Sequence, residues 1–263
     1  MNGIKMFSSI NTNLLKKINT SYKGLIMSKN SVGDNINTEN AGWKFSGEMV
    51  KDFEKHVSKS VPLYSEGHDI ILKISDYFVK DDSICYEIGT STGILSYKLA
   101  KRFLDRGAKF IGLDIEEDMI AIAKSRYRLD SLEFISADVL EFDFKPSDFI
   151  TSYYVVQFIR PSHRQLLIDK IYQRLNWGGA FLYFEKVRAP DARFQDIMTG
   201  VYNEYKLEQG YTAEEIIQKS RSLKGVLEPF STQGNIDMLK RAGFIDIMSV
   251  AKFGPFEGIL AIK

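Results

Sequence analysis

Short apolar runs alternate with amphipathic segments along this chain, and that alternation limits the folds it can adopt. Runs typical of buried strands occupy 84–88, 109–114, 132–136, 148–153 and 179–185. Helical periodicity fills the intervals at 92–105, 117–127 and 162–175. Strands and helices that alternate at this rhythm form βαβ units, with helices on both faces of the sheet. The sequence therefore predicts an α/β, Rossmann-like fold with a mostly parallel sheet.

The C-terminal end departs from this rhythm. A predicted helix at 233–242 ends at Gly243, a residue well suited to a helix C-terminus, and strands are predicted at 244–252 and 256–262. Only three residues, Phe253-Gly254-Pro255, separate these strands, which is too short for a crossover connection. We therefore expect seven strands, the last two forming an antiparallel hairpin.

The remaining segments define the domain organisation. Helices are predicted at 46–58 and 65–79, and the polar, helical stretch at about 191–228 is expected to be an insertion or a cap. The first 33 residues contain no Asp or Glu and many polar side chains, so we expect 1–42 to be a flexible N-terminal leader, with a short helix around 13–22 as the alternative. Residues 43–263 are then one domain.

Composition excludes several classes of protein. The net charge of +1 provides no global field for nucleic acid or an anionic membrane, and no apolar run approaches the ~20 residues of a membrane span. Cys85 is the single cysteine, so an internal disulfide is excluded and no cysteine-based zinc site is expected. We expect a cytoplasmic protein without a metal.

The first predicted strand runs into a glycine loop, Gly89-Thr90-Ser91-Thr92-Gly93, and a helix follows at once. Such a loop lets a nucleotide-like ligand approach the backbone, and the helix N-terminus directs free N–H groups at it. A dinucleotide site prefers glycine where this loop has Ser91. Glu87 would also repel a pyrophosphate, whereas it suits the ammonium or the positive sulfonium of S-adenosylmethionine.

Carboxylates fall at the ends of the first three predicted strands: Glu87, Asp114 and Asp138. The carboxyl ends of parallel strands line one crevice, where ligands bind. Asp114 is placed to accept hydrogen bonds from both ribose hydroxyls, and Asp138 from the adenine amino group. The backbone N–H of Val139 is expected to face the adenine ring, with Ile115 and Met119 packing on its faces.

The set Glu87-x-Gly89-x-Ser91-x-Gly93, Asp114 and Asp138 resembles the S-adenosylmethionine site of the class I methyltransferase superfamily, over about 80–263. The antiparallel final hairpin points to the same superfamily. Methyl transfer from a sulfonium needs alignment of the acceptor more than acid–base help, so the lack of a catalytic dyad is compatible with this class.

Further segments carry a closer resemblance. They are Trp43-x-Phe45, Ser60-Val61-Pro62-x-Tyr64, Gln157-Phe158-Ile159-x-Pro161, Asp169-Lys170-Ile171-Tyr172, Glu185-Lys186, Gly210-Tyr211, Gln218-Lys219 and Lys240-x-Ala242-Gly243-Phe244. This series is similar to the carboxy-S-adenosylmethionine synthase family over roughly 43–263. Enzymes of that family convert S-adenosylmethionine and prephenate into a carboxylated sulfonium, which is used later in tRNA wobble uridine modification.

The resemblance implies a set of ligand contacts and a homodimer built through the N-terminal and insertion helices. The family's tyrosine near the methionine part of the ligand corresponds to Tyr64, and a polar residue after the fourth strand corresponds to Ser152. The other implied contacts are Gly89, Thr90, Ser91, Asp114, Ile115, Asp138 and Val139.

Two positions depart from the family pattern. The asparagine that the family uses after its fourth strand is replaced by Ser152, and the second departure is the more serious one. The family places an arginine directly after Gln-Lys, where it holds the extra carboxylate, but this chain has Ser220 there and Arg221 next to it. A one-residue step rotates a side chain by about 100° around a helix, so Arg221 does not simply replace the missing group. Guanidinium recognition of a carboxylate is geometrically demanding. The departure favours a relative that changed its chemistry.

Three hypotheses for function follow. Across them, the candidate catalytic residues are Tyr153, His163 and Arg221. The first is a methyltransferase acting on a small molecule, with Tyr153, His163 or a tyrosine of the insertion near the acceptor. The second is a carboxy-S-adenosylmethionine synthase in which Arg221 replaces the family's arginine. The third is a non-catalytic S-adenosylmethionine-binding protein. Lys186 and Arg188, after the fifth predicted strand, either attract an anionic substrate or lie only at the rim.

Overall fold

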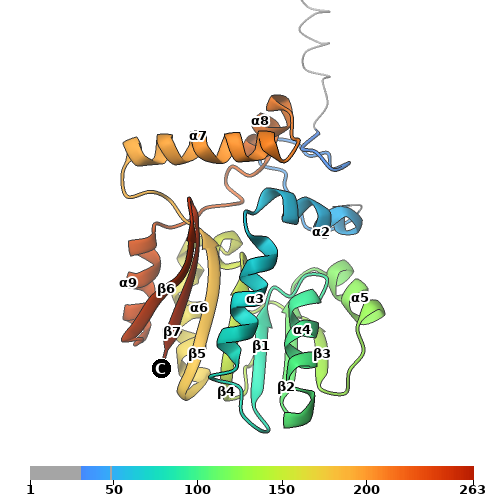
Figure 1. Ribbon diagram of the computed structural model, residues 1–263, viewed down its shortest axis with the longest axis vertical. Helices are drawn as coiled ribbons and strands as arrows, with labels where there is room; N and C mark the ends of the chain where they lie inside the picture. The colour runs from blue at the N-terminus through green and yellow to red at the C-terminus, as the bar shows by residue number, and fades with distance from the viewer. Residues whose placement is uncertain (1–30, 48) are drawn as a thin grey trace, which may run out of the picture.

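Seven strands form one sheet in the computed structural model, which describes residues 31–47 and 49–263 (Figure 1). The order across the sheet is β3-β2-β1-β4-β5-β7-β6, with β7 antiparallel to both of its neighbours and the other pairings parallel. The strands are β1 Ile84–Ile88, β2 Lys109–Asp114, β3 Leu132–Ser136, β4 Ser147–Tyr153, β5 Leu175–Lys186, β6 Asp246–Phe253 and β7 Phe256–Ile262. The predicted sheet and its C-terminal hairpin are confirmed.

Helices cover both faces of this sheet (Figure 1). One face carries α3 Tyr64–Ser75, α4 Ile94–Arg102 and α5 Glu117–Arg126, and the other carries α6 Pro161–Arg174 and α9 Thr232–Ala242. Successive strand residues point to opposite faces, so in β4 Phe149 packs with the core under α3 and α4, and Ile150 with the core under α6 and α9. The central strands are thus buried on both faces, which explains their continuous apolar runs.

Several element boundaries differ from the predictions, among them the end of the helix predicted at 65–79, which stops at Ser75. The first predicted helix between strands ends early, because α4 stops at Arg102 and a 3-10 turn at Leu104–Arg106 leads into the left-handed Gly107. Strand β5 begins at Leu175, before the predicted 179, and its pairing with β4 shifts register between Ser147 and Phe149. Glycine weakens the sequence pattern of a strand, so Gly178 and Gly179 explain why this irregular first part of β5 was not predicted.

A helical layer lies beyond the carboxyl ends of the parallel strands (Figure 1). It consists of α2 Met49–Ser60, α7 Ala192–Glu208 and α8 Ala213–Ser222. Helix α8 begins with a capping box, in which Thr212 accepts a hydrogen bond from the Glu215 backbone and the Glu215 side chain accepts one from the Thr212 backbone. The helical insertion expected at 191–228 therefore forms part of a cap over the sheet.

Residues 31–42 belong to this cap, although we expected them in a flexible leader. Val32 and Ile36 are buried against Trp43 and Met49, which offsets the entropy lost by ordering the segment. The backbone N–H of Ala41 donates to the carbonyl of Arg221 at 3.0 Å, which ties the segment to α8. The helix expected at 13–22 lies outside the described residues. In the part of the chain that the structure describes, no helix is long and apolar enough to cross a membrane.

Candidate functional site

A cavity of about 1180 Å³ lies between the sheet and the helical cap. Its floor consists of residues that follow the five parallel strands β1 to β5, and its roof comes from α2, α7 and α8. This is the position at which open parallel sheets bind ligands, because the loops after neighbouring strands converge there.

The glycine loop forms one wall of the cavity. Gly89 has φ 70°, and a Cβ at that position would lie 2.3 Å from Val155 Cγ2, so no other residue fits without displacing Val155 in the segment that follows β4. Ser91 also adopts a positive φ, 51°, which is uncommon for a residue with a side chain. Its backbone N–H donates to Asp114 Oδ2 at 2.7 Å. This bond holds the loop against the end of β2 and leaves its backbone facing the cavity.

Glu87 lies beneath the loop and is almost completely buried. The Thr90 hydroxyl donates to its carboxylate at 2.9 Å, and the Ser96 hydroxyl donates to the same oxygen. Burial raises the pKa of Glu87 to about 7, although both hydroxyl bonds oppose the change. A cation placed in the cavity would therefore draw Glu87 fully into its ionised form.

The other two predicted carboxylates also line the cavity. Asp114 Oδ1 accepts from the Glu116 backbone N–H at 3.0 Å, and Asp138 Oδ1 accepts from the Leu140 backbone N–H at 2.9 Å. Burial raises the pKa of Asp114, and bonds from backbone N–H groups partly offset it. Both side chains are thus oriented by their own loops before any ligand binds.

Most of the predicted contact residues surround this cavity. Those that line it are Tyr64, Glu87, Gly89, Thr90, Ser91, Asp114, Ile115, Met119, Asp138 and Val139. Gly93 does not: it precedes α4 with φ 84° and packs against Phe134 and Ala123. Ser152 does not either, because side chains alternate along β4 and it is its neighbour Tyr153 that faces the cavity. The structure thus gives Gly93 a packing role and replaces Ser152 by Tyr153 at the cavity wall.

The three candidate catalytic residues differ in their surroundings. The Tyr153 hydroxyl donates to the backbone carbonyl of Tyr64 at 2.6 Å, and its ring centroid lies 4.7 Å from that of His68. This bond fixes the phenol, and burial raises its pKa well above the ordinary value. His163 and Arg221 both touch the cavity but are exposed side chains at its rim.

Three lysines, of which Lys206 and Lys219 are buried and Lys186 is half-buried, form a basic end of the cavity near Tyr202. The Nζ atoms of Lys186 and Lys206 each lie 4.4 Å from the centroid of the Tyr202 ring, a distance typical of a cation–π contact. Lys219 approaches from α8, and its Nζ donates to Ser60 Oγ at 2.6 Å. Within residues 31–47 and 49–263, no carboxylate lies within 4.0 Å of any of these three ammonium groups. None of the three is therefore paired directly with a carboxylate in this part of the chain.

Burial lowers the pKa of all three lysines. It brings the pKa of Lys186 and of Lys206 to about 8, and repulsion by Lys206 and Lys224 adds to the effect at Lys186. The pKa of Lys219 falls to about 7, by burial first and then by repulsion from Lys206 and Lys186. Of these three lysines, the sequence analysis indicated only Lys186 as a residue that could attract an anionic substrate. Lys206 and Lys219 lie on separate helices, and no motif spacing connects them.

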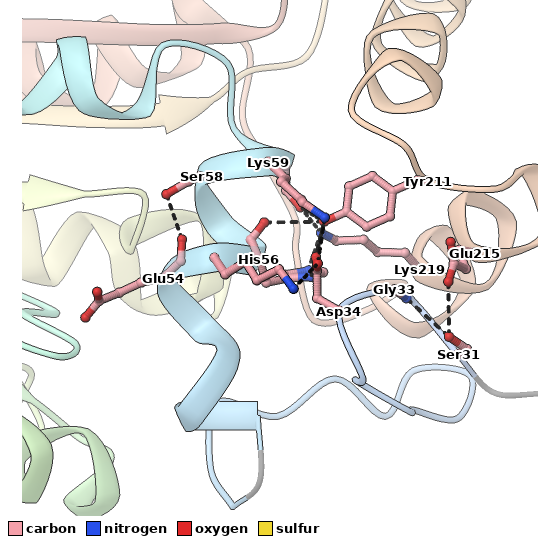
Figure 2. Close-up of polar contacts among 12 residues, drawn as sticks. Ser31, Gly33, Asp34, Glu54, His56, Ser58, Lys59, Tyr211, Glu215 and Lys219 are labelled. Carbon is pink, nitrogen blue, oxygen red and sulfur yellow. Dashed lines mark hydrogen bonds and ion pairs between the residues drawn. The ribbon is translucent and has the colours of Figure 1, made fainter.

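Figure 2 shows the polar cluster that holds Lys219. His56 Nε2 lies 2.6 Å from Lys219 Nζ, and His56 Nδ1 lies 3.1 Å from Asp34 Oδ2. Burial and the neighbouring Lys219 lower the pKa of His56 to about 3, so its ring is neutral. Because Nε2 faces an ammonium donor, the ring proton is on Nδ1 and is donated to Asp34.

Asp34 is the anionic centre of this cluster (Figure 2). Its carboxylate also accepts hydrogen bonds from Lys59 Nζ at 2.9 Å and from the Tyr211 hydroxyl at 2.8 Å. These bonds occupy both oxygens and lower the pKa of Asp34 against the effect of its burial. Asp34 therefore neutralises Lys59 directly, and it reaches Lys219 only through the ring of His56.

No group of three or more His, Cys, Asp and Glu side chains suited to hold a metal ion is found among the residues that the structure describes.

Comparisons with known proteins agree with this architecture. A methyltransferase domain family matches residues 86–179. A solved structure of phosphoethanolamine N-methyltransferase 2 from Haemonchus contortus, in complex with S-adenosyl-L-methionine, superposes with a TM-score of 0.57 at 16% identity, covering 81% of this chain and 57% of that one. At that identity the likeness concerns the fold alone.

Curated relatives match over nearly their whole length. The carboxy-S-adenosyl-L-methionine synthase of Staphylococcus epidermidis is 41% identical over 222 residues, which cover 84% of this chain and 97% of that protein. The enzyme of the same name from Nautilia profundicola is 38% identical over 223 residues, covering 84% and 94%. The expected class I fold and the expected membership of the S-adenosylmethionine-dependent transferases are confirmed. Sequence and architecture together show that this chain belongs to the carboxy-S-adenosyl-L-methionine synthase family.

Proposed function

We propose that this protein is a carboxy-S-adenosylmethionine synthase that uses prephenate as its second substrate. The observation that carries the proposal is that the two ends of the cavity carry side chains of opposite charge. One end presents Asp114 and Asp138, and the other presents the three ammonium groups near Tyr202. The first end suits a nucleoside that donates hydrogen bonds, and the second suits an anion.

S-adenosylmethionine occupies the acidic end in this proposal. Asp114 accepts hydrogen bonds from the ribose hydroxyls, and Asp138 accepts one from the adenine amino group. Glu87 lies under the loop that would contact the methionine part, where its ionised form stabilises the ammonium and the sulfonium. Tyr64 and Tyr153 border the same region, and their rings lie 5.0 Å apart.

Prephenate occupies the basic end. The reaction replaces one hydrogen of the S-methyl group by a carboxylate. Prephenate loses carbon dioxide and hydroxide and becomes the aromatic phenylpyruvate, carbon dioxide joins the methyl carbon, and the methyl proton leaves with the hydroxide as water. The protein's part is to hold both substrates together and to exclude bulk water, which would otherwise capture the reactive species. The helical cap over the cavity serves this exclusion.

Methyl transfer to an anionic small molecule is the second candidate. The observation that favours it is Ser220, at the position where the family resemblance implies an arginine. A neutral methyl acceptor fits less well, because three ammonium groups that lack a carboxylate partner in the described part of the chain are costly to keep unless the ligand supplies negative charge.

One experiment separates these functions. The purified protein is incubated with S-adenosylmethionine and prephenate, and the products are resolved by liquid chromatography and mass spectrometry. We expect carboxy-S-adenosylmethionine and phenylpyruvate in equal amounts. A methylated acceptor without carboxylated sulfonium would reject the synthase proposal, and the absence of S-adenosylmethionine binding would reject both functions. Protein without prephenate is the control.

We further propose that the enzyme is a cytoplasmic homodimer with a small-molecule substrate. Phe194, Ile197 and Val201 recur on one side of α7 and are 52, 49 and 47% exposed, an arrangement that favours a partner helix. Light scattering on the purified protein tests the oligomeric state, and a monomeric mass would contradict it.

A further inference from the structure

We infer that Lys219, together with Lys186 and Lys206, binds the carboxylates of the second substrate and replaces the arginine that is missing at position 220. This inference rests on the proposed function and identifies which side chains of the basic end recognise the anion. The three lysines come from β5, α7 and α8, so the subsite depends on the packing of the cap over the sheet.

The three ammonium groups converge through Tyr202 and Ser60. Lys186 and Lys206 contact the Tyr202 ring, and the Tyr202 hydroxyl donates to the backbone carbonyl of Ser60 at 2.7 Å. The hydroxyl of the same Ser60 accepts the hydrogen bond from Lys219. All five side chains line the cavity. A carboxylate adjacent to Tyr202 is therefore within reach of all three lysines.

Lys219, Ser220 and Arg221 all line the cavity, and position along α8 decides which of them is buried there. Lys219 is 9% exposed, whereas Ser220 and Arg221 are both exposed. Each step along a helix turns the side chain by about 100°, so a buried Lys219 requires Arg221 to point away from the same spot. The backbone carbonyl of Arg221 also pairs with the N-terminal segment at Ala41, which holds this turn of the helix in place. The buried cation of α8 is thus lysine, one residue before the position of the family's arginine.

The charges around Lys219 leave it in need of an anion. From α2 it faces the neutral ring of His56, and beyond this ring lies Asp34, whose oxygens are already bonded to Lys59, His56 and Tyr211. From α7 and β5 it faces Lys206 and Lys186, and Lys224 adds positive charge near Lys186. Trp43 presents its ring 5.4 Å from Lys219 Nζ. The surroundings hold the ammonium in place and leave its charge for a ligand.

His56 acts as a positioning residue for Lys219. Its neutral ring accepts a hydrogen bond from the Lys219 ammonium at Nε2 and donates one to Asp34 from Nδ1, and it adds no charge to the cavity. The sequence segment that supplies Asp34 packs as part of the cap, so the N-terminal segment contributes to the anion subsite although it contacts no ligand directly.

The test uses the full chain saturated with S-adenosylhomocysteine, which cannot react, and titrates prephenate by isothermal calorimetry. We expect K219Q and K206Q each to weaken prephenate binding by about 10- to 100-fold, since each removes a charged hydrogen-bond donor. K219R keeps the charge and is expected to retain more affinity than K219Q. S-adenosylhomocysteine binding is expected to change by less than about threefold in all three variants. K240Q, at an exposed position on α9, is the matched control.

The outcomes separate this inference from the proposed function. If the wild-type protein makes carboxylated product and both K219Q and K206Q bind prephenate normally, the subsite assignment is wrong and the function stands. If the variants lose prephenate binding but the wild-type protein makes no carboxylated product, the subsite stands and the function falls. Loss of binding in R221Q, with K219Q unaffected, would overturn the inference in favour of Arg221. If K219Q does not fold, K206Q decides.

Discussion

Replacing Lys206 by methionine should make the ligand-free protein more stable and its anion site weaker. Lys206 is 6% exposed, and burial alone lowers its pKa from 10.5 to about 8. That change corresponds to ~3 kcal/mol of cost for keeping the charged form in the folded state. Methionine removes this cost and retains an unbranched apolar side chain, but it loses the contact with Tyr202, worth ~0.5–1 kcal/mol.

We therefore expect K206M to gain ~1–2 kcal/mol at pH 7 after allowing for partial exposure to water in the cavity, which raises Tm by roughly 3–6 °C. The lowered pKa of Lys206 also fixes the direction in which this stability gain changes with pH. The cost is fully present below the folded pKa of about 8 and disappears as pH rises toward the unfolded value of 10.5. The gain in Tm must therefore shrink between pH 7 and pH 9.5.

Differential scanning calorimetry on ligand-free protein at pH 7 and pH 9.5 measures this effect. K80M, at an exposed lysine, is the control and should leave Tm within about 1 °C, as surface substitutions usually do. An unchanged or lower Tm for K206M at pH 7, or a gain that does not shrink at alkaline pH, would show that Lys206 is already neutralised and would refute the reasoning.

Three further predictions concern the ligands. D114A should weaken the binding of S-adenosylmethionine and S-adenosylhomocysteine by about 10- to 100-fold in calorimetry, because the two hydrogen bonds from the ribose hydroxyls to an ionised acceptor are lost. D105A, at an exposed position, serves as the control. Unchanged affinity in D114A would contradict the ribose assignment. The affinity for S-adenosylmethionine should rise as pH increases through about 7, where Glu87 ionises, and should do so more than for S-adenosylhomocysteine, which lacks the sulfonium charge. E87Q should remove this difference, and equal pH profiles for both ligands would count against a sulfonium near Glu87. Prephenate affinity should change in the opposite direction, falling as pH rises from about 7 past 8 while the lysines lose their protons, and a flat profile would argue against ammonium recognition.

Local pattern was sufficient for much of the fold and for the nucleoside half of the site. β1, β2 and β3 have the predicted bounds, because each is a short apolar run that ends in a turn. Glu87, Asp114 and Asp138 could be placed at one cavity, because residues that follow parallel strands must meet at the same edge of the sheet. The error at Ser152 is a shift of one residue, which in a strand moves a side chain to the opposite face.

The anion end could not be predicted in this way. Lys186, Lys206 and Lys219 belong to three elements, and their convergence depends on how α7 and α8 cross the end of the sheet. Asp34 was expected in a flexible leader, but the apolar Val32 and Ile36 bring it into the cap, where it binds His56.

The alternation of strands and helices along the chain determined the strands, the C-terminal hairpin and the loops at the carboxyl ends of the strands, since the periodicity that forms each element is local in sequence. Only the tertiary structure decided that Lys219 is buried at the cavity while Arg221 lies exposed at its rim, and that the neighbouring lysines have no carboxylate partner in the described part of the chain. Burial and charge compensation are properties of distant segments packed together, and no local pattern records them.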